Sequence, residues 1–210
     1  MDFAQKLKQT LLQELPGESF QYRMAPVSRP RFQESQKLVE NYRESAVAVI
    51  LHQLSQEEHG IILIQRPEYK GSHSGQVSFP GGKKEHHDDS LLETAQRECH
   101  EEIGLELNAQ HYLGQLSPVL IPVSGFHVEP HVFFHDDLPQ LEADPREVQH
   151  IFNIRTNELL DDQNIRQTKI KLESGAFLRD VPYFDLERKV IWGATALILS
   201  ELKEVLRRSI

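Results

Sequence analysis

Three glutamates lie close together in the segment RECHEEIG, residues 97–104, at Glu98, Glu101 and Glu102. If the segment is helical, the second and third follow the first by three and four residues, so all three side chains can point toward one place. Exposed like charges at this spacing repel each other by roughly a few tenths of a kcal/mol per pair. Either the glutamates form the solvated acidic face of a surface helix, or a bound cation offsets their repulsion.

The cation hypothesis has a definite chemistry. Carboxylate oxygens are the ligands that Mg²⁺ and Mn²⁺ prefer, and such ions can hold a pyrophosphate and lower the pKa of an attacking water. Upstream, Pro80-Gly81-Gly82 interrupts the chain with glycines, where backbone can approach a ligand closely because no side chain intervenes. A carbonyl oxygen there could complete a metal shell, and Arg97 could brace the cluster by bidentate pairing.

The residues around the glutamates predict the helix that they need, over residues 90–103. Ser90 and Glu93 match a capping box at its start, and Gly104 suits the position just after its end. At about 100° per residue, its apolar residues form one core-facing stripe beside the glutamates. That stripe consists of Leu92, Ala95, Cys99 and Ile103. Cys99 is the only cysteine, and on this stripe it is interpreted as a small buried apolar residue rather than a nucleophile.

The rest of the chain predicts strands and two further helices. Apolar runs typical of strands are found at 46–54, 60–66, 75–79, 112–122, 126–135 and 151–155, with a hairpin-like pair at 169–173 and 182–186. Amphipathic helices are expected over 3–15 and 190–208. Strands that bracket strong helices indicate an α/β or α+β fold around a mixed sheet. We divide the chain into an N-terminal helix and connector, residues 1–44, and one domain, residues 45–210.

Composition narrows the class of protein. The chain has 210 residues, of which 39% are hydrophobic and 26% charged, as in globular domains. Its apolar runs fall short of the roughly 20 residues of a membrane helix, and its start lacks a signal-peptide pattern, so a cytoplasmic location and no membrane partner are expected. A net charge of −9 argues against nucleic-acid binding. A small anionic substrate stays compatible, because divalent cations can lie between it and an acidic protein.

The glycines and the glutamate helix together resemble the Nudix box. The family form is a glycine, five residues, a glutamate, seven residues, then Arg-Glu-aliphatic-x-Glu-Glu-x-Gly-aliphatic. The second half is matched by Arg97, Glu98, Cys99, Glu101, Glu102, Gly104 and Leu105. In the first half, five residues after Gly82 lead to Asp88, whereas seven residues before Arg97 lead to Asp89. The box is therefore one residue longer than the family form, with an aspartate in place of the glutamate.

The coenzyme A diphosphohydrolase branch of the Nudix superfamily commonly carries this extra residue and an aspartate. Three further segments resemble the same branch: SGQVSFPGGKKE, VLIPVSGFHVEPHV and IWGATA. The resemblance covers roughly residues 45–208. It implies a Nudix α/β/α sandwich with a mixed sheet. It also implies metal-dependent hydrolysis of coenzyme A or acyl-coenzyme A to 3′,5′-ADP and 4′-phosphopantetheine or its acylated form.

The resemblance also implies which residues form the site. The metal, Mg²⁺ or Mn²⁺, would be bound by Glu98, Glu101 and Glu102 with the carbonyl of Gly82. Catalytic roles would fall to Glu101, Glu102, Arg97 and Glu147, where Arg97 orients a glutamate and Glu147 is an extra ligand or a base. The substrate phosphates would meet Arg66, Lys70 and His73, unless these residues only form a solvated loop.

One part of the branch pattern is not met. It begins with Leu-Leu-Thr-x-Arg and continues to a small residue and a second arginine. Here Arg66 is present, but the threonine, the small residue and the second arginine are replaced by Ile64, Pro67 and Gly71. Lys70 could substitute in part, although without a bidentate fork. These departures favour an alternative substrate: ADP-ribose, NADH or a dinucleoside polyphosphate. A nucleotide sensor without activity is a further alternative, against which the intact glutamates argue.

Three other features leave two interpretations each. Asp88 either pairs with Arg97 or only ends the loop. His86 and His87 either face water, which we expect because their spacing is not that of a chelating zinc site, or bind a metal. The helix over 3–15 either packs on the domain or forms the face of a homodimer. The expected partner is a small nucleotide.

Overall fold

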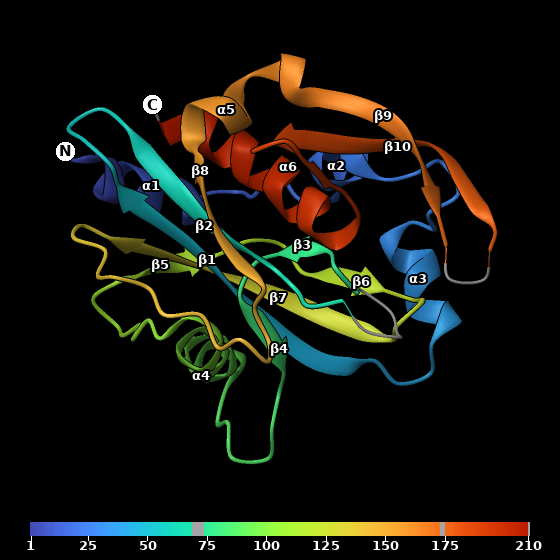
Figure 1. The fold of residues 1–210 in the computed structure, drawn as a ribbon, viewed down its shortest axis with the longest axis horizontal. Coiled ribbons are helices and arrows are strands. Elements are labelled where there is room, and N and C mark those ends of the chain that lie inside the picture. The colour runs from blue at the N-terminus through green and yellow to red at the C-terminus, as the bar shows by residue number, and fades with distance from the viewer. Residues whose placement is uncertain (69–73, 173–174, 210) are drawn as a thin grey trace.

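The computed structural model describes residues 1–68, 74–172 and 175–209. One large mixed sheet lies between helix α4 on one side and helices α6 and α1 on the other (Figure 1). Its helices are α1 (Phe3–Leu11), α2 (Glu18–Gln21), α3 (Phe32–Leu38), α4 (Leu91–Ile103), α5 (Thr156–Leu160) and α6 (Gly193–Ser209), with 3-10 turns η1 (Tyr22–Met24) and η2 (Asp162–Asn164). The expected α/β/α sandwich with a mixed sheet is confirmed.

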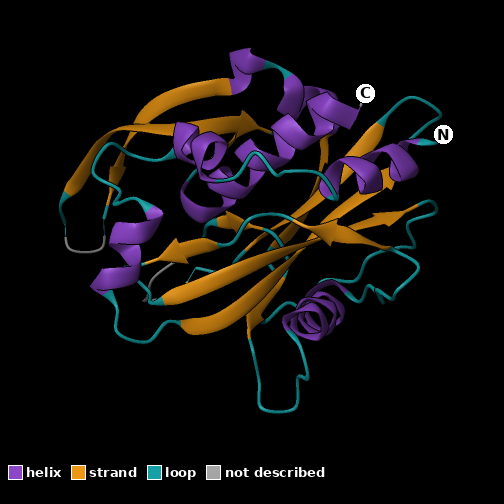
Figure 2. Ribbon diagram, turned by 180° about the vertical axis from the view of Figure 1, so that it is seen from behind, coloured by secondary structure: helices purple, strands orange, loops and turns teal. Residues whose placement is uncertain are grey.

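The strands form two sheets (Figure 2). The large sheet contains β1 (Arg43–Gln53), β2 (His59–Gln65), β3 (Val77–Ser78), β4 (Gly81–Lys83), β5 (Tyr112–Gln115), β6 (Val119–Ile121), β7 (Phe126–His135) and β8 (His150–Arg155). The small antiparallel sheet contains β9 (Ile165–Lys171), β10 (Phe177–Leu186) and β11 (Lys189–Ile191). The predicted hairpin-like pair is β9 with β10.

The site is positioned by a divergence between β1 and β2. Strand β7 runs parallel to β1 along one edge, over residues 43–52. On its other edge β1 pairs first with β4, at residues 45–47, and then with β2, at residues 51–53. Strand β2 likewise pairs with β8 along one edge and with β1 and then β3 on the other. The two strands therefore splay apart, and the segment from β3 to β4 fills the wedge between them.

The continuous apolar run of β1 is explained by burial on both faces. Ala46, Ala48 and Ile50 pack in the layer beneath α4, whereas Val49 and Leu51 pack in the layer beneath α6 and α1. All five are fully buried. A strand covered on both faces reads as a continuous hydrophobic stretch rather than an alternating one.

The N-terminal segment is joined to the domain through a buried carboxylate. Glu201 of α6 is fully buried and has no cationic partner among the described residues. It accepts hydrogen bonds from the backbone N of Gly17 (3.0 Å), Nε2 of Gln21 (2.8 Å) and Oγ of Ser117 (2.7 Å). A buried charge is tolerated when several donors satisfy it. These bonds fix the connector between α1 and α2 against α6 and the loop before β6.

Several element boundaries differ from the sequence expectations. The last helix begins at Gly193, not at residue 190, because residues 189–191 pair with β10 as strand β11. Helix α4 has the expected Ser90 cap and the left-handed Gly104. Only half of the capping box forms, since Glu93 accepts from the backbone N of Asp89 (2.8 Å). Within the described residues, no helix combines the length and apolar character that crossing a membrane requires.

Candidate metal and active site

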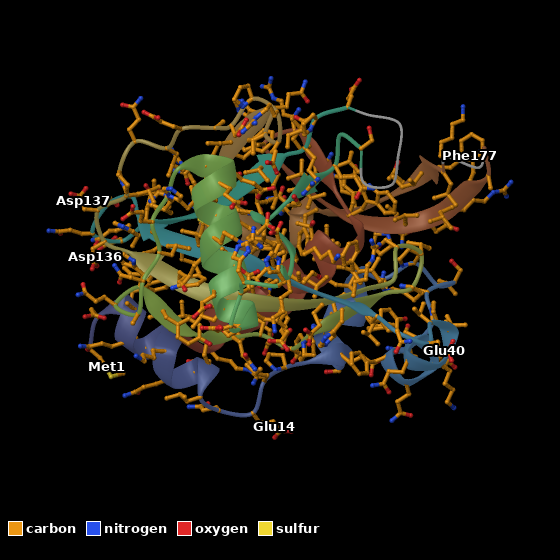
Figure 3. The ribbon with its side chains drawn as sticks, turned by 90° about the horizontal axis from the view of Figure 1, so that it is seen from below. Met1, Glu14, Glu40, Asp136, Asp137 and Phe177 are labelled. Carbon is orange, nitrogen blue, oxygen red and sulfur yellow. The ribbon has the colours of Figure 1, made fainter. Side chains whose placement is uncertain are left out.

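Helix α4 lies across the strands of the large sheet (Figure 3), and Arg97 is the centre of its polar side. The guanidinium donates from Nε to Oδ1 of Asp88 (2.9 Å) and from Nη2 to Oδ2 (3.0 Å). Asp88 is buried and also accepts from Oγ1 of Thr94 (2.9 Å) and from the backbone N of Glu85 (2.8 Å). These donors hold the pKa of the Asp88 carboxyl well below its usual range, with the Arg97 bond as the largest cause. Of the two sequence interpretations, pairing with Arg97 is confirmed.

The same guanidinium orients two of the glutamates. Its Nη1 donates to Oε1 of Glu98 (2.9 Å) and to Oε2 of Glu101 (3.0 Å), and its Nη2 donates to the carbonyl of Lys83 (3.1 Å). Arg97 thereby ties helix α4 to both ends of the loop over residues 83–88. This geometry is what a residue that positions the glutamates requires.

Gly82 lies directly against Glu98. A Cβ atom added at Gly82 would collide with the Glu98 carboxylate, so any side chain at this position would displace that carboxylate. The backbone of β4 can therefore approach the helix closely, as the glycine pair predicted. Burial is the first cause that raises the pKa of Glu98, against the lowering effect of Arg97.

Glu102 is the most deeply placed carboxylate of the box. It is 1% exposed, its Oε2 accepts from the backbone N of Gly81 (2.8 Å), and its Oε1 lies 3.6 Å from Nη1 of Arg66. Burial raises its pKa to about 8, and the hydrogen bond from Gly81 opposes the shift. Removing this carboxylate from water thus costs free energy that a nearby cation would offset.

Glu147 reaches the site from another part of the chain. The loop before β8 docks on the C-terminal end of α4 through two backbone bonds, Glu142 N to Ile103 O (3.0 Å) and Asp144 N to Glu102 O (2.9 Å). A turn follows, in which the backbone N of Glu147 donates to the Asp144 carbonyl (3.0 Å). The loop therefore returns the Glu147 side chain to the glutamates of α4.

Three carboxylates converge as a result. Glu98, Glu102 and Glu147 each offer an oxygen atom, and these atoms lie within 4.8 Å of one another. An all-oxygen set of this charge suits Mg²⁺ or Mn²⁺, and the raised pKa values of Glu98 and Glu102 show the unfavourable state that such a cation would relieve. The donor set therefore fits the metal that the sequence implies.

Not every predicted site residue joins this group. Glu101 is half-exposed and turned to Arg97, outside the three converging carboxylates, and its role as a ligand stays a prediction. Arg66 lies beside Glu102, and its contact with substrate phosphates stays a prediction. Lys70 and His73 fall outside the described residues. The sequence analysis did not predict that the backbone N–H of Gly81 donates to Glu102. The double glycine was the signal that could have suggested it.

A second group of side chains that could bind a metal lies in the loop after β4. Glu85, His86 and His87 are exposed, and their ligand atoms lie within 4.8 Å of one another. His87 Nδ1 lies 3.6 Å from Oε2 of Glu85. Both histidines are exposed, and which of the two interpretations applies to them stays a prediction.

Comparison with known proteins adds to this geometry. The family model described as NUDIX domain matches residues 42–173. A protein of Yersinia enterocolitica named as an uncharacterized Nudix hydrolase, NudL, is 34% identical over 178 residues, covering 85% of this chain and 90% of its own. The protein of the same name from Yersinia pestis strain Pestoides F is 32% identical over 157 residues, covering 75% of this chain and 77% of its own.

Solved structures share the fold. A MutT/nudix family protein from Enterococcus faecalis superposes with a TM-score of 0.56 at 14% identity, covering 97% of this chain and 74% of its own. The Nudix hydrolase RenU of M. smegmatis gives a TM-score of 0.52 at 14% identity, covering 87% of this chain and 92% of its own. At such identities the likeness concerns the fold alone.

Proposed function

This chain belongs to the Nudix hydrolase family, whose members act on pyrophosphate bonds, and from this premise we propose that it hydrolyses the diphosphate of coenzyme A or acyl-coenzyme A. The products would be 3′,5′-ADP and 4′-phosphopantetheine or its acylated form. The reaction would require Mg²⁺ or Mn²⁺.

Metal-dependent hydrolysis is supported above all by one observation. Glu98, Glu102 and Glu147 converge beside the glycine backbone of β4. Two of these residues come from the box helix and the third from a distant loop. On a solvated acidic face, Glu102 would not be buried to 1% exposure. Nor would Glu98 lie so close to Gly82 that only glycine fits at position 82. The arrangement supports a cation site over a solvated helix face.

The three carboxylates would hold the metal, which when bound would neutralise the diphosphate oxygens and lower the pKa of the attacking water. Arg97 fixes Glu98 by one hydrogen bond and fixes the loop that carries Asp88 by two. Glu102 is held by the Gly81 N–H, and Arg66 beside it would meet a phosphate oxygen. Glu147 would serve as a ligand or would accept the proton of the attacking water.

The choice of coenzyme A as the substrate is supported by features of the sequence. Asp88, five residues after Gly82, is the acid that meets Arg97, so the extra residue of the box lies between Asp88 and Arg97. This long spacer with aspartate, and the three segments that resemble the coenzyme A branch, support coenzyme A. The departures at Ile64, Pro67 and Gly71 support another nucleoside diphosphate derivative.

The test is a substrate panel at equal concentrations with Mg²⁺ or Mn²⁺: coenzyme A, acetyl-coenzyme A, ADP-ribose, NADH and diadenosine tetraphosphate, with products resolved by mass. Release of 3′,5′-ADP from coenzyme A faster than hydrolysis of the other compounds is expected. Active protein that cleaves ADP-ribose but releases no 3′,5′-ADP would exclude coenzyme A as the substrate.

A further inference from the structure

A cationic side chain from the small sheet lies next to the end of β2. Nζ of Lys189 donates to Oε1 of Gln65 (3.1 Å) and lies 5.4 Å from the ring centroid of Phe152. Within the residues that the structure describes, the Lys189 ammonium forms no ion pair with a carboxylate. In an acidic protein, a half-buried cation whose polar contact among the described residues is an amide oxygen can pair with an anion.

The backbone that presents Lys189 is strained. The turn between β10 and β11 places both Glu187 (φ 50°) and Arg188 (φ 57°) in the left-handed region, which costs a non-glycine residue on the order of 1 kcal/mol. Strand β11 also packs against β3, and Oγ1 of Thr195, just after it, donates to the carbonyl of Val77 (3.0 Å). The turn is thereby held at the end of the sheet, and Lys189 is held with it.

An aromatic pair from β8 borders the same position. His150 is the strand partner of Gln65, and its exposed imidazole lies edge to face on Phe152, with ring centroids 4.6 Å apart. The imidazole adds a hydrogen-bond donor and a flat surface to the Lys189 ammonium and the Gln65 amide. Together, Gln65, His150 and Lys189 form what we name the β2-end cluster.

The β2-end cluster adjoins the metal site along the chain, although it lies on the other face of the sheet. Gln65 belongs to the face of β2 that points toward α6, since Ile64 packs beneath α4 and side chains alternate. The next residue, Arg66, turns to Glu102 on the α4 side. His150 likewise follows Glu147 by three residues, a chain length that spans at most roughly 10 Å. A nucleotide whose diphosphate lies at the carboxylates would therefore reach the cluster around the end of β2, where Arg66 follows Gln65.

We propose that the β2-end cluster binds a phosphate monoester that the substrate carries in addition to its diphosphate. This inference rests on the proposed function, and it names the recognition of the 3′-phosphate as the step that selects the substrate. Lys189 supplies the charge, His150 a second donor, and Gln65 holds the ammonium in place. Lys189 acts in binding and takes no part in bond cleavage.

The test compares nucleotides that differ only in this phosphate. Calorimetry in Mg²⁺ measures the binding of 3′,5′-ADP and of 5′-AMP to the wild type, to Lys189→Met, and to Arg188→Met as the matched control from the same turn. Methionine keeps the aliphatic contact with Phe152 and removes the charge. We expect Lys189→Met to weaken 3′,5′-ADP binding about tenfold, the usual scale of one charge-assisted contact. Binding of 5′-AMP should not change, and Arg188→Met should bind both nucleotides as the wild type does.

Kinetics give the second readout. For Lys189→Met, KM for coenzyme A should rise about tenfold while kcat and the KM for dephospho-coenzyme A stay constant, and Lys189→Arg should restore the preference. Equal weakening of both nucleotides, or of neither, would overturn the subsite. Absence of coenzyme A hydrolysis by the wild type would refute the proposed function instead, and the 3′,5′-ADP and 5′-AMP measurements would still decide the subsite.

Discussion

Arg97 holds both oxygens of the buried Asp88 carboxylate at 2.9 and 3.0 Å while its remaining donors reach Glu98, Glu101 and the Lys83 carbonyl. One guanidinium therefore fixes the loop over residues 83–88 and sets the orientation of a candidate metal ligand. The aspartate that departs from the family form thus braces the overlong box from within.

Asp88→Asn should destabilise the protein. The change removes the charge from the carboxylate that accepts two Arg97 hydrogen bonds, and breaking a largely buried pair lowers the free energy of unfolding by about 3 kcal/mol. Because the pKa of Asp88 lies below its usual range, this contribution is present above the ordinary carboxyl pKa and is lost as the pH falls below it. Urea unfolding at neutral pH measures the loss. Asp89→Asn, an exposed neighbour, is the control, and equal effects of the two changes would contradict the prediction.

Glu102→Gln should separate activity from stability. Amide nitrogen and neutral oxygen bind Mg²⁺ poorly, so turnover should fall by about a hundredfold or more. The free energy of unfolding should hold or rise without metal, because burial opposes the charged form of this carboxyl, which is 1% exposed, and an amide has no such form. Steady-state kinetics and urea unfolding measure the two effects. Glu106→Gln, an exposed control, should change neither, and full activity of Glu102→Gln would refute the metal site.

Gly82→Ala should act through Glu98. The added Cβ collides with the Glu98 carboxylate, so affinity for Mn²⁺ should fall about tenfold or more, as measured by calorimetry. In a Glu98→Ala background the collision is absent, and Gly82→Ala should then have little additional effect. Additive losses in this double-mutant cycle would show that Gly82 matters for another reason.

His131 should make stability depend on mildly acidic pH. It is 4% exposed, neither ring nitrogen has a hydrogen-bond partner among the described residues, and burial lowers its pKa to about 4. As pH falls below about 6.5, the unfolded chain takes up this proton before the folded protein does. About 3 kcal/mol of stability should therefore be lost between pH 6.5 and pH 4. The His131→Gln variant should not lose this stability between pH 6.5 and pH 4. The His127→Gln variant, changed on the same strand, should lose it as the wild type does.

Glu201→Gln should loosen the N-terminal segment. An amide cannot accept from Gly17, Gln21 and Ser117 together, so unpaired donors would stay buried at a cost of about 2 kcal/mol or more. We expect faster limited proteolysis before β1, read by mass spectrometry, with Glu106→Gln as the exposed control. Unchanged cleavage would show that apolar packing alone holds this segment.

The box helix was predictable because its signals are local. Ser90 caps the start of α4, Gly104 ends it, and the apolar stripe places Cys99 in the core with 0% exposure. Period and cap residues depend on neighbours within one turn, so the sequence contains them. The same periodicity could not show that Arg97 would turn Glu101 away from the other two glutamates.

The remaining elements depend on distant partners. Strand β4 is Gly81-Gly82-Lys83, which has no strand propensity and pairs only because β1 offers a free edge in the wedge. Strand β11 has three residues, too few to show alternation. Glu147 approaches the box through backbone bonds to the end of α4, which no side-chain pattern records. Its membership of the site could be suggested only by family resemblance.

The parallel pairing of β1 with β7 has a kinetic consequence. It joins residues more than 80 positions apart and encloses the whole box between them, and contacts of such separation form late because the loop must first be closed. Helix α4 can form early, but the sheet on which it packs, and with it the support of the site, is complete only after this pairing. A divalent ion should therefore leave the refolding rate nearly unchanged and slow unfolding, so that its whole stabilisation appears as a longer lifetime of the folded enzyme.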